Sequence, residues 1–131
     1  MGKYGETAVQ STQLIRDGLY SSPLDAWQQA AAIVFSQQPS SQKKGCPKDT
    51  FLSLCGAGLV AGVPAGEYTR SKYNKEYALK AYQALVSDPT LGQDHKKLWI
   101  ASCGDANKKD NSQMDVVCSL WDAGLLDKKT Y

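Results

Sequence analysis

Apolar residues recur along this chain at the three- and four-residue spacing that places them on one face of an α-helix. Over residues 6–17 this face carries Ala8, Ser11, Leu14 and Ile15, and Gly18 follows as a stop signal. No stretch alternates between apolar and polar residues for long enough to predict a strand. The hydrophobic pattern therefore predicts a helical protein.

The second predicted helix has the clearest start signal in the chain. Ser22 is its N-cap, Pro23 occupies the first turn, and Asp25 completes an S-x-x-D capping box. Its apolar face consists of Leu24, Trp27, Ala31, Val34 and Phe35. The polar stretch 36–45 then ends the helical pattern.

Four more amphipathic segments follow. They cover residues 47–57, residues 71–86, a segment centred on Leu98, Trp99 and Ser102, and residues 113–123. The chain thus predicts one compact all-α domain that spans residues 1–131 and contains about six amphipathic helices. We expect Trp27, Leu54, Leu98 and Trp121 to share its core.

Two of these helices end on similar sequences, SLCGAGLV at 53–60 and SLWDAGLL at 119–126. Gly58 and Gly124 stand just past the last helical residue, where a left-handed conformation ends a helix. A Leu that folds back onto the previous turn follows each glycine, as in a Schellman motif. We interpret the repeat as two similar helix ends and not as a duplicated functional motif.

The starts of the same two helices also correspond. Asp49 and Asp115 lie in the first turns, where a carboxylate favours the helix dipole. Ser112 and Asp115 form a predicted capping box, and Cys46 is the corresponding but poorer N-cap candidate.

Composition and net charge add little to the prediction of a helical protein. The chain has 131 residues, of which 42% are hydrophobic and 21% charged, and a formal net charge of +2. This balance is globular and does not by itself indicate a nucleic-acid-binding protein or an acidic tail. No apolar run is long enough to span a bilayer, and the start, MGKYGET, has no signal-peptide pattern. We therefore expect a cytoplasmic protein.

The four cysteines are expected to be reduced thiols. They stand at positions 46, 55, 103 and 118, contain no C-x-x-C pair, and accompany a single histidine, His95. This spacing predicts neither a metal site nor a cofactor. Cys46 could serve as a nucleophile only if His95 lay within hydrogen-bond reach in a cleft, which would favour an enzyme of unknown class. No catalytic residue is predicted.

A basic segment gives the strongest candidate chemistry. Residues 40–80 contain seven Lys or Arg and three Asp or Glu, whereas the flanking segments are slightly acidic. Lys43, Lys44 and Gly45 precede a predicted helix start, where free N–H groups favour an anion. The ordinary alternative is a solvated loop that caps its own helix.

The helices that share their end signals could also bring their N-terminal loops to one end of the domain. Amide and cationic donors would then converge on an anionic or carbonyl-bearing ligand. The candidate residues of this composite site are Gln42, Lys43, Lys44, Arg70, Asn111 and Gln113. The alternative is that these loops lie at different ends of the domain.

A second hypothesis concerns residues 68–80, where basic and aromatic residues alternate as in a DNA-recognition helix. The candidate nucleic-acid contacts are Tyr68, Arg70, Lys72, Tyr73, Asn74 and Lys75. The connection from Ala57 to Ser71 is much longer than the turn of a helix-turn-helix, which favours a solvated basic helix start instead.

Four segments together, SSQKKGCP, FLSLCxxGLV, VPAGxYTRS and NSQMDVVxxxWxxGL, resemble a family of small bacterial proteins known only as a domain of unknown function. The resemblance implies a bacterial cytoplasmic protein and carries no catalytic residue, cofactor or partner. The residues themselves favour a non-enzymatic binding or interaction domain that uses the basic surface 43–75, with an anionic small molecule or a protein as partner. Nucleic-acid binding through residues 68–80 is the second hypothesis, and an enzyme of unknown class is the third.

Overall fold

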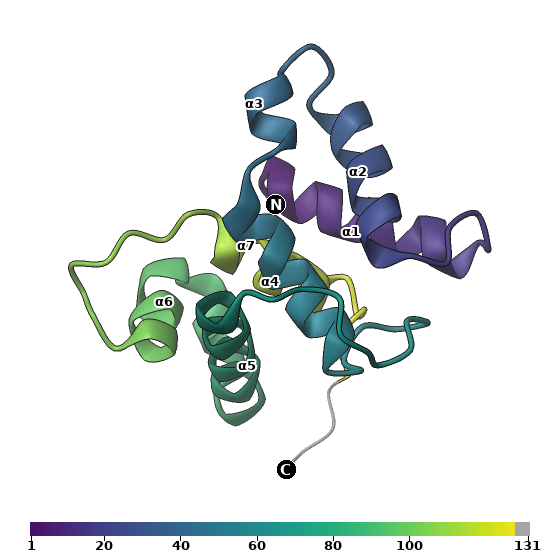
Figure 1. Cartoon of the computed structure of the whole chain (residues 1–131). Coiled ribbons are helices and arrows are strands. Elements are labelled where there is room, and N and C mark those ends of the chain that lie inside the picture. Colours follow the sequence, from purple (N-terminus) through teal and green to yellow (C-terminus); the bar gives the residue numbers. More distant parts are fainter. Residues whose placement is uncertain (128–131) are drawn as a thin grey trace.

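The computed structural model describes residues 1–127, which form helices joined by loops (Figure 1). In chain order the elements are α1 (Lys3–Arg16), α2 (Pro23–Val34), α3 (Pro39–Gln42), α4 (Gly45–Gly56), α5 (Lys72–Ser87), the 3₁₀ helix η1 (Pro89–Gln93), α6 (His95–Cys103) and α7 (Gln113–Asp122). The described chain contains no strand beyond one isolated bridge. The predicted all-α fold is confirmed.

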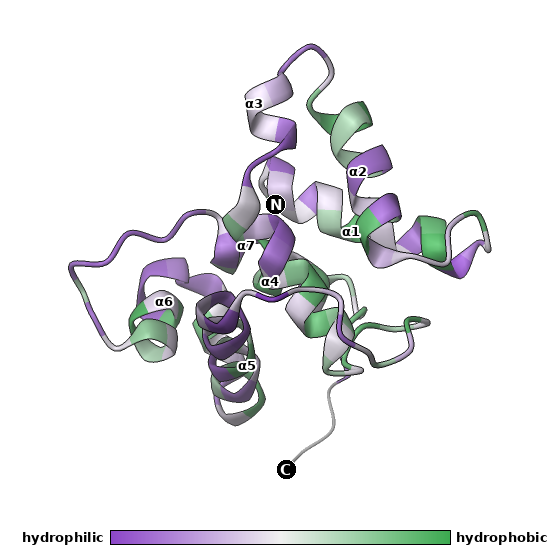
Figure 2. Ribbon diagram, viewed as in Figure 1, coloured by the Kyte–Doolittle hydropathy of each residue, from purple (hydrophilic) through white to green (hydrophobic). Residues whose placement is uncertain are grey.

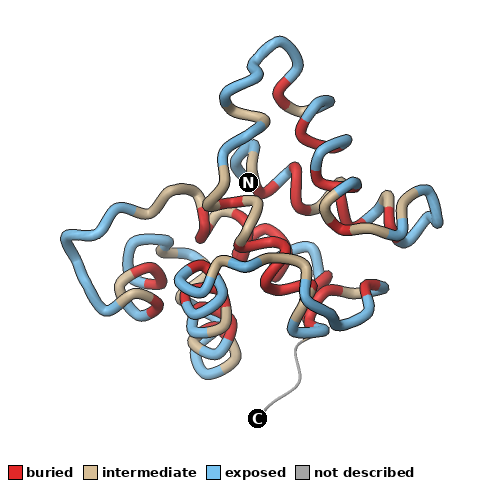
Figure 3. Tube along the Cα trace, viewed as in Figure 1, coloured by how far each residue is buried: buried red, intermediate tan, exposed pale blue. Residues whose placement is uncertain are grey.

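Helices α4 and α7 occupy the centre of the molecule. Helices α1 and α2 pack on one side of them, and α5 and α6 pack on the other (Figure 1). Every residue from Thr50 to Cys55 and from Val116 to Trp121 is buried, as Figure 3 shows along the central trace. A helix that is buried on nearly all sides belongs in the core and not at the surface.

The buried apolar side chains form one continuous cluster. It includes Trp27, Leu54, Leu98 and Trp121, which confirms the predicted core. The Trp27 and Phe51 ring centroids lie 5.4 Å apart, which joins α2 to α4. Hydrophilic residues dominate the loop that precedes α7 (Figure 2).

The two similar helix ends lie side by side. Gly58 and Gly124 have φ values of +75° and +73°, as their predicted role as stop signals requires. Leu59 N–H donates to Leu54 O at 3.2 Å, and Leu125 N–H donates to Leu120 O at 2.9 Å. Both ends are therefore Schellman motifs.

The segments that leave these motifs then pair with each other. Val60 and Leu126 form an antiparallel bridge. Ala61 N–H donates to Leu125 O, and Asp127 N–H donates to Leu59 O, both at 2.8 Å. The repeated sequence thus ends two neighbouring central helices at one place in the fold.

The predicted helix starts need two corrections. Helix α4 begins at Gly45 with Lys44 as its N-cap, so Cys46 lies inside the helix. Ser112 has a φ of +71° and makes no side-chain cap, which means that the predicted capping box with Asp115 is wrong. Asp110 accepts the Met114 N–H at 3.3 Å instead, and the Asp115 carboxylate is hydrogen-bonded to the start of α1.

Two short elements were not predicted. Helix α3 lies in the polar stretch 36–45, which was expected to be non-helical, and it starts at Pro39. The 3₁₀ helix η1 follows Asp88, whose carboxylate accepts the Thr90 N–H at 3.1 Å. Neither element has an apolar stripe, so the hydrophobic pattern carries no sign of them.

Candidate functional site

A hollow of about 320 Å³ lies between α4 and the start of α5. Leu52, Ser53 and Gly56 of α4 form one wall. The remaining lining residues belong to the loop before α5 and to its first turn: Gly66, Glu67, Tyr68, Thr69, Arg70, Ser71, Lys72 and Lys75. The loop crosses in front of α4 in Figure 1.

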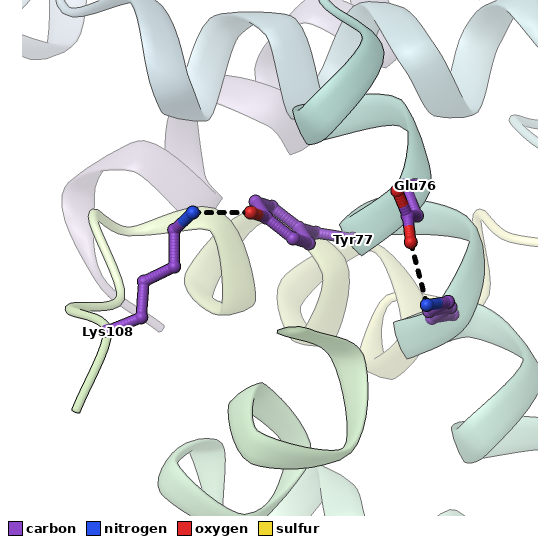
Figure 4. Close-up of polar contacts among 4 residues, drawn as sticks. Glu76, Tyr77 and Lys108 are labelled. Atoms are coloured by element: carbon purple, nitrogen blue, oxygen red, sulfur yellow. Dashed lines mark hydrogen bonds and ion pairs between the residues drawn. The ribbon is translucent and has the colours of Figure 1, made fainter. Parts of the chain in front are cut away.

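The charged side chains of this hollow are mostly cationic. Arg70, Lys72 and Lys75 are exposed, and Glu67 is the one carboxylate that lines the hollow. Within residues 1–127 the single ion pair is Lys80 with Glu76 at 2.7 Å, drawn in Figure 4. The three cations of the hollow therefore have no ion-pair partner in the described part of the protein.

The first turn of α5 adds backbone donors. Ser71 is the N-cap, and its hydroxyl accepts the Asn74 N–H at 3.4 Å. The N–H groups of Lys72 and Tyr73 have no acceptor within residues 1–127. Unpaired amides at a helix start, with the positive end of the helix dipole, favour an anion.

Ser53 is one of the residues that line the hollow, and its buried hydroxyl has no hydrogen-bond partner in the described chain. The residue is 3% exposed, and its Oγ is the only buried side-chain N or O atom in residues 1–127 without a hydrogen-bond partner. The other buried serine and threonine hydroxyls of the helices all have a partner. Those of Thr7, Ser11, Thr12, Thr50 and Ser102 donate to the carbonyl four residues earlier, and that of Ser119 donates to Asp115 Oδ1. A buried hydroxyl without a partner is unfavourable, so its presence calls for an explanation.

A chain of hydrogen bonds holds this side of the hollow in place. The Thr69 hydroxyl donates to Asp49 Oδ1 at 3.0 Å and accepts the Ser71 N–H at 3.2 Å. Asn74 Nδ2 donates to Ser71 Oγ at 3.0 Å, and Gln113 Nε2 donates to Asn74 Oδ1 at 3.2 Å. The starts of α4, α5 and α7 are thereby connected through side chains.

Comparison with known protein families identifies the chain. Residues 1–127 match DUF6979, described as a family of unknown function. The chain belongs to this family. A search of curated proteins and a search of solved structures each gave no match. The predicted resemblance to a domain of unknown function is confirmed, and DUF6979 membership adds no activity to the argument from the residues.

In this DUF6979 chain the residues of the predicted composite site occupy three places. Gln42 Nε2 donates to Phe35 O at 2.9 Å, and Lys44 Nζ lies 5.8 Å from the Tyr4 ring centroid, next to α1. Lys43 is exposed nearby. Arg70 lines the hollow, whereas Gln113 is buried and accepts the Asn111 N–H through its side-chain oxygen. Among the described residues no hydrogen bond joins Arg70 to the other five. A common ligand for all six stays a prediction.

The candidate nucleic-acid residues also separate, because α5 turns them to different sides. Tyr68, Arg70, Lys72 and Lys75 line the hollow. Asn74 is buried, and its amide is hydrogen-bonded to Ser71 and Gln113. Tyr73 is 72% exposed and stacks on Tyr77 with ring centroids 6.5 Å apart.

Lys108 extends from the loop before α7 toward Tyr77 (Figure 4). Its Nζ donates to the Tyr77 hydroxyl at 2.5 Å and lies 4.9 Å from the Tyr77 ring centroid and 5.6 Å from that of Tyr73. Trp99 Nε1 donates to Lys108 O at 2.7 Å. We name this contact the Lys108 latch. It was not predicted, because loop lysines carry no signal of a distant partner.

The structure gives no support to catalysis by Cys46. His95 is exposed at the start of α6, and no hydrogen bond joins it to Cys46 within residues 1–127. The described chain also has no cluster of three His, Cys, Asp or Glu residues that could hold a metal ion. None of the helices in residues 1–127 is both long and apolar enough to cross a membrane.

Proposed function

We propose that this protein is a non-enzymatic binding domain whose hollow between α4 and α5 holds a small ligand through a phosphate or carboxylate group. The observation that carries this proposal is a hollow lined by three cations without an ion-pair partner and by Ser53, whose buried hydroxyl has no hydrogen-bond partner, both among the described residues. In this proposal the Ser53 side chain turns toward the hollow, where a ligand oxygen supplies the hydrogen-bond partner that it lacks.

The charges of the hollow support an anionic ligand. Arg70, Lys72 and Lys75 line the hollow together with one carboxylate, that of Glu67, which leaves an excess of two positive charges. Arg70 can bind a phosphate or carboxylate through two parallel hydrogen bonds, and Lys72 and Lys75 act as point charges. The sequence predicted a binding surface over residues 43–75. This proposal restricts the binding site to the residues that line one hollow.

Calorimetric titration with inorganic phosphate and with acetate at low ionic strength tests the proposal. We expect at least one anion to bind and to raise the unfolding temperature, because a ligand that binds only the folded state stabilises it. Arg70→Ala should weaken binding about tenfold, the loss expected for one charge-assisted contact. The matched control is Lys43→Ala, an exposed cation outside the hollow, which should bind as the wild type does.

Ser53→Ala tests the anion site without changing the charge of the protein surface. Removing a buried hydroxyl that has no partner should leave the unfolding temperature unchanged or raise it slightly, while anion affinity falls. The proposal fails if neither anion binds, or if Arg70→Ala and Ser53→Ala both bind with wild-type affinity.

Nucleic-acid binding by the start of α5 is the second candidate. The observation in its favour is Tyr73, an exposed ring with Lys108 Nζ 5.6 Å from its centroid, on which a base could stack. This hypothesis expects retardation of single-stranded DNA or RNA at low salt, a steep loss of affinity as salt rises, and weaker binding by Tyr73→Ala. Absence of retardation at low salt would exclude it.

A further inference from the structure

We infer that the ligand of the hollow joins one anionic group to an apolar body about the size of one ring. The inference rests on the proposed anion site and adds the class of molecule that carries the anion. It follows from the different chemistry of the two parts of the hollow, from the fixed position of one tyrosine ring, and from the volume available.

The hollow has a cationic part and an apolar part. The cationic part is the start of α5, with Arg70, Lys72 and Lys75. The other part consists of an apolar side chain, two glycines and an aromatic ring: Leu52, Gly56, Gly66 and Tyr68. A ligand that fills both parts needs a charged group at one end and an uncharged, apolar surface at the other.

Two backbone contacts bring the loop close to α4 and shape the apolar part. Gly66 N–H donates to Gly56 O at 3.1 Å. A Cβ on Gly56 would lie 2.6 Å from Gly66 O, and a Cβ on Gly66 would lie 3.1 Å from the Cζ atom of Tyr68. Glycine at both positions therefore allows the loop and the Tyr68 ring to lie against the end of α4.

The Tyr68 ring is held in position without a ligand. Its hydroxyl donates to Pro64 O at 2.7 Å, and the half-buried ring packs against the hydrophobic core. A ring that is already fixed loses little conformational freedom on binding, and its face can stack on a flat apolar group.

The volume of the hollow and its one acidic residue limit the size and the charge of the ligand. A volume of about 320 Å³ lies near the lower end of the roughly 300–1,000 Å³ typical of small-molecule pockets, which is more than one small anion fills. Glu67 lines the same hollow and repels a second anionic group. Both features favour a ligand with one anionic group and a neutral body.

Titration with matched probes tests the inference. Phenyl phosphate is compared with inorganic phosphate, benzoate is compared with acetate, and glycerol phosphate supplies a polar body of similar length. We expect at least one aromatic probe to bind about tenfold more tightly than its small counterpart, because part of a ring leaves water. Glycerol phosphate should also bind more tightly than inorganic phosphate by a much smaller factor than phenyl phosphate does.

Variants of Tyr68 test whether its ring causes the higher affinity of the aromatic probe. Tyr68→Ala should remove most of the advantage of the aromatic probe and leave the affinity for the small anion within about threefold. Tyr68→Phe keeps the ring, loses only the hydroxyl that bonds Pro64, and should retain the advantage. Arg70→Ala should weaken the aromatic probe and the small anion together.

The outcomes separate this inference from the proposed function. If small anions bind but neither aromatic probe binds more tightly, or if glycerol phosphate gains as much as phenyl phosphate, the inference is overturned and the anion site stands. If no anion binds at all, the proposed function itself fails. The comparison of probes on the wild-type protein decides this even if Tyr68→Ala does not fold.

Discussion

Asp115 of α7 caps the start of α1 at Gly2, 113 residues earlier in the chain. Its Oδ1 accepts the Gly2 N–H at 2.8 Å, and its Oδ2 accepts the Gly5 N–H at 2.7 Å. The close approach depends on Gly5, because a Cβ there would lie 1.9 Å from Ser119 Oγ. One carboxylate thus satisfies two free N–H groups of a helix start and joins two helices.

Asp115→Ala should lower the free energy of unfolding by about 1–3 kcal/mol, because two amides at the start of α1 lose a charged acceptor. Urea denaturation followed by circular dichroism measures the change. The control is Asp122→Ala, an exposed carboxylate at the end of the same helix. Equal stability of the two variants would contradict the capping role.

Gly124→Ala should destabilise the protein by about 1–2 kcal/mol, because φ at this position is +73° and only glycine adopts that conformation without strain. A Cβ there would meet no atom within 4 Å, so the loss is conformational and not steric. Gly45→Ala is the matched control. Gly45 opens α4, and the nearest atom to its added Cβ, Asp49 Oδ2, would be 3.8 Å away, so this change should be tolerated. Thermal unfolding of both variants provides the comparison.

The Lys108 latch should order the loop before α7. The hydrogen bond to Tyr77 raises the pKa of Lys108, so the side chain stays charged at neutral pH and keeps its attraction to both tyrosine rings. Lys108→Met should speed amide hydrogen exchange in residues 104–111 with little change in global stability. Lys109→Met removes a neighbouring exposed cation that has no such contact, and exchange should stay at the wild-type rate.

Asp110 should make stability depend on pH in the acidic range. Burial raises the pKa of its carboxyl above the ordinary value of an aspartate, although the Met114 and Gln113 N–H groups and the charge of His95 act in the opposite direction. The native state then binds the proton more tightly than the unfolded state, so this group lowers stability as pH rises through the window between the two pKa values.

Asp110→Asn removes this titration and keeps a side-chain oxygen for capping α7. Its stability relative to the wild type should therefore rise with pH across that window and become constant above it. Urea denaturation at several pH values between about 4 and 7 measures the difference. A stability of Asp110→Asn that falls relative to the wild type as pH rises would contradict the assignment.

The four thiols should react in two groups. Burial raises the pKa of the Cys55 thiol and raises that of Cys118 to about 12, so both stay protonated near neutral pH. Cys46 and Cys103 are only half-buried. Iodoacetamide should modify Cys46 and Cys103 first in the native protein and all four after unfolding, as peptide mass spectrometry can show. Early modification of Cys55 or Cys118 would contradict the buried positions.

Structural features that depend on a few neighbouring residues, such as helix caps and helix ends, could be predicted from the sequence. The stripe of Leu24, Trp27 and Ala31 and the cap at Ser22 defined α2, and the Ser22 hydroxyl accepts the Asp25 N–H as expected. Gly58 and Gly124 identified two helix ends correctly. Helical period, capping and positive φ depend on neighbours within one or two turns, which the sequence lists directly.

Contacts between distant residues were decided by the tertiary structure alone. Ser112 forms no capping box, and the Asp115 carboxylate caps α1, 113 residues away, instead. Ser53 stands in an apolar stretch that gives no sign of an unpaired hydroxyl. Packing brings the start of α5 and the Gly56–Gly66 contact together around one hollow. The sequence by itself determined which segments are helical and where they stop, because those choices are local. Which polar groups remain unpaired depends on which helices lie next to one another. The tertiary structure alone determines these neighbours, because they are distant in the sequence.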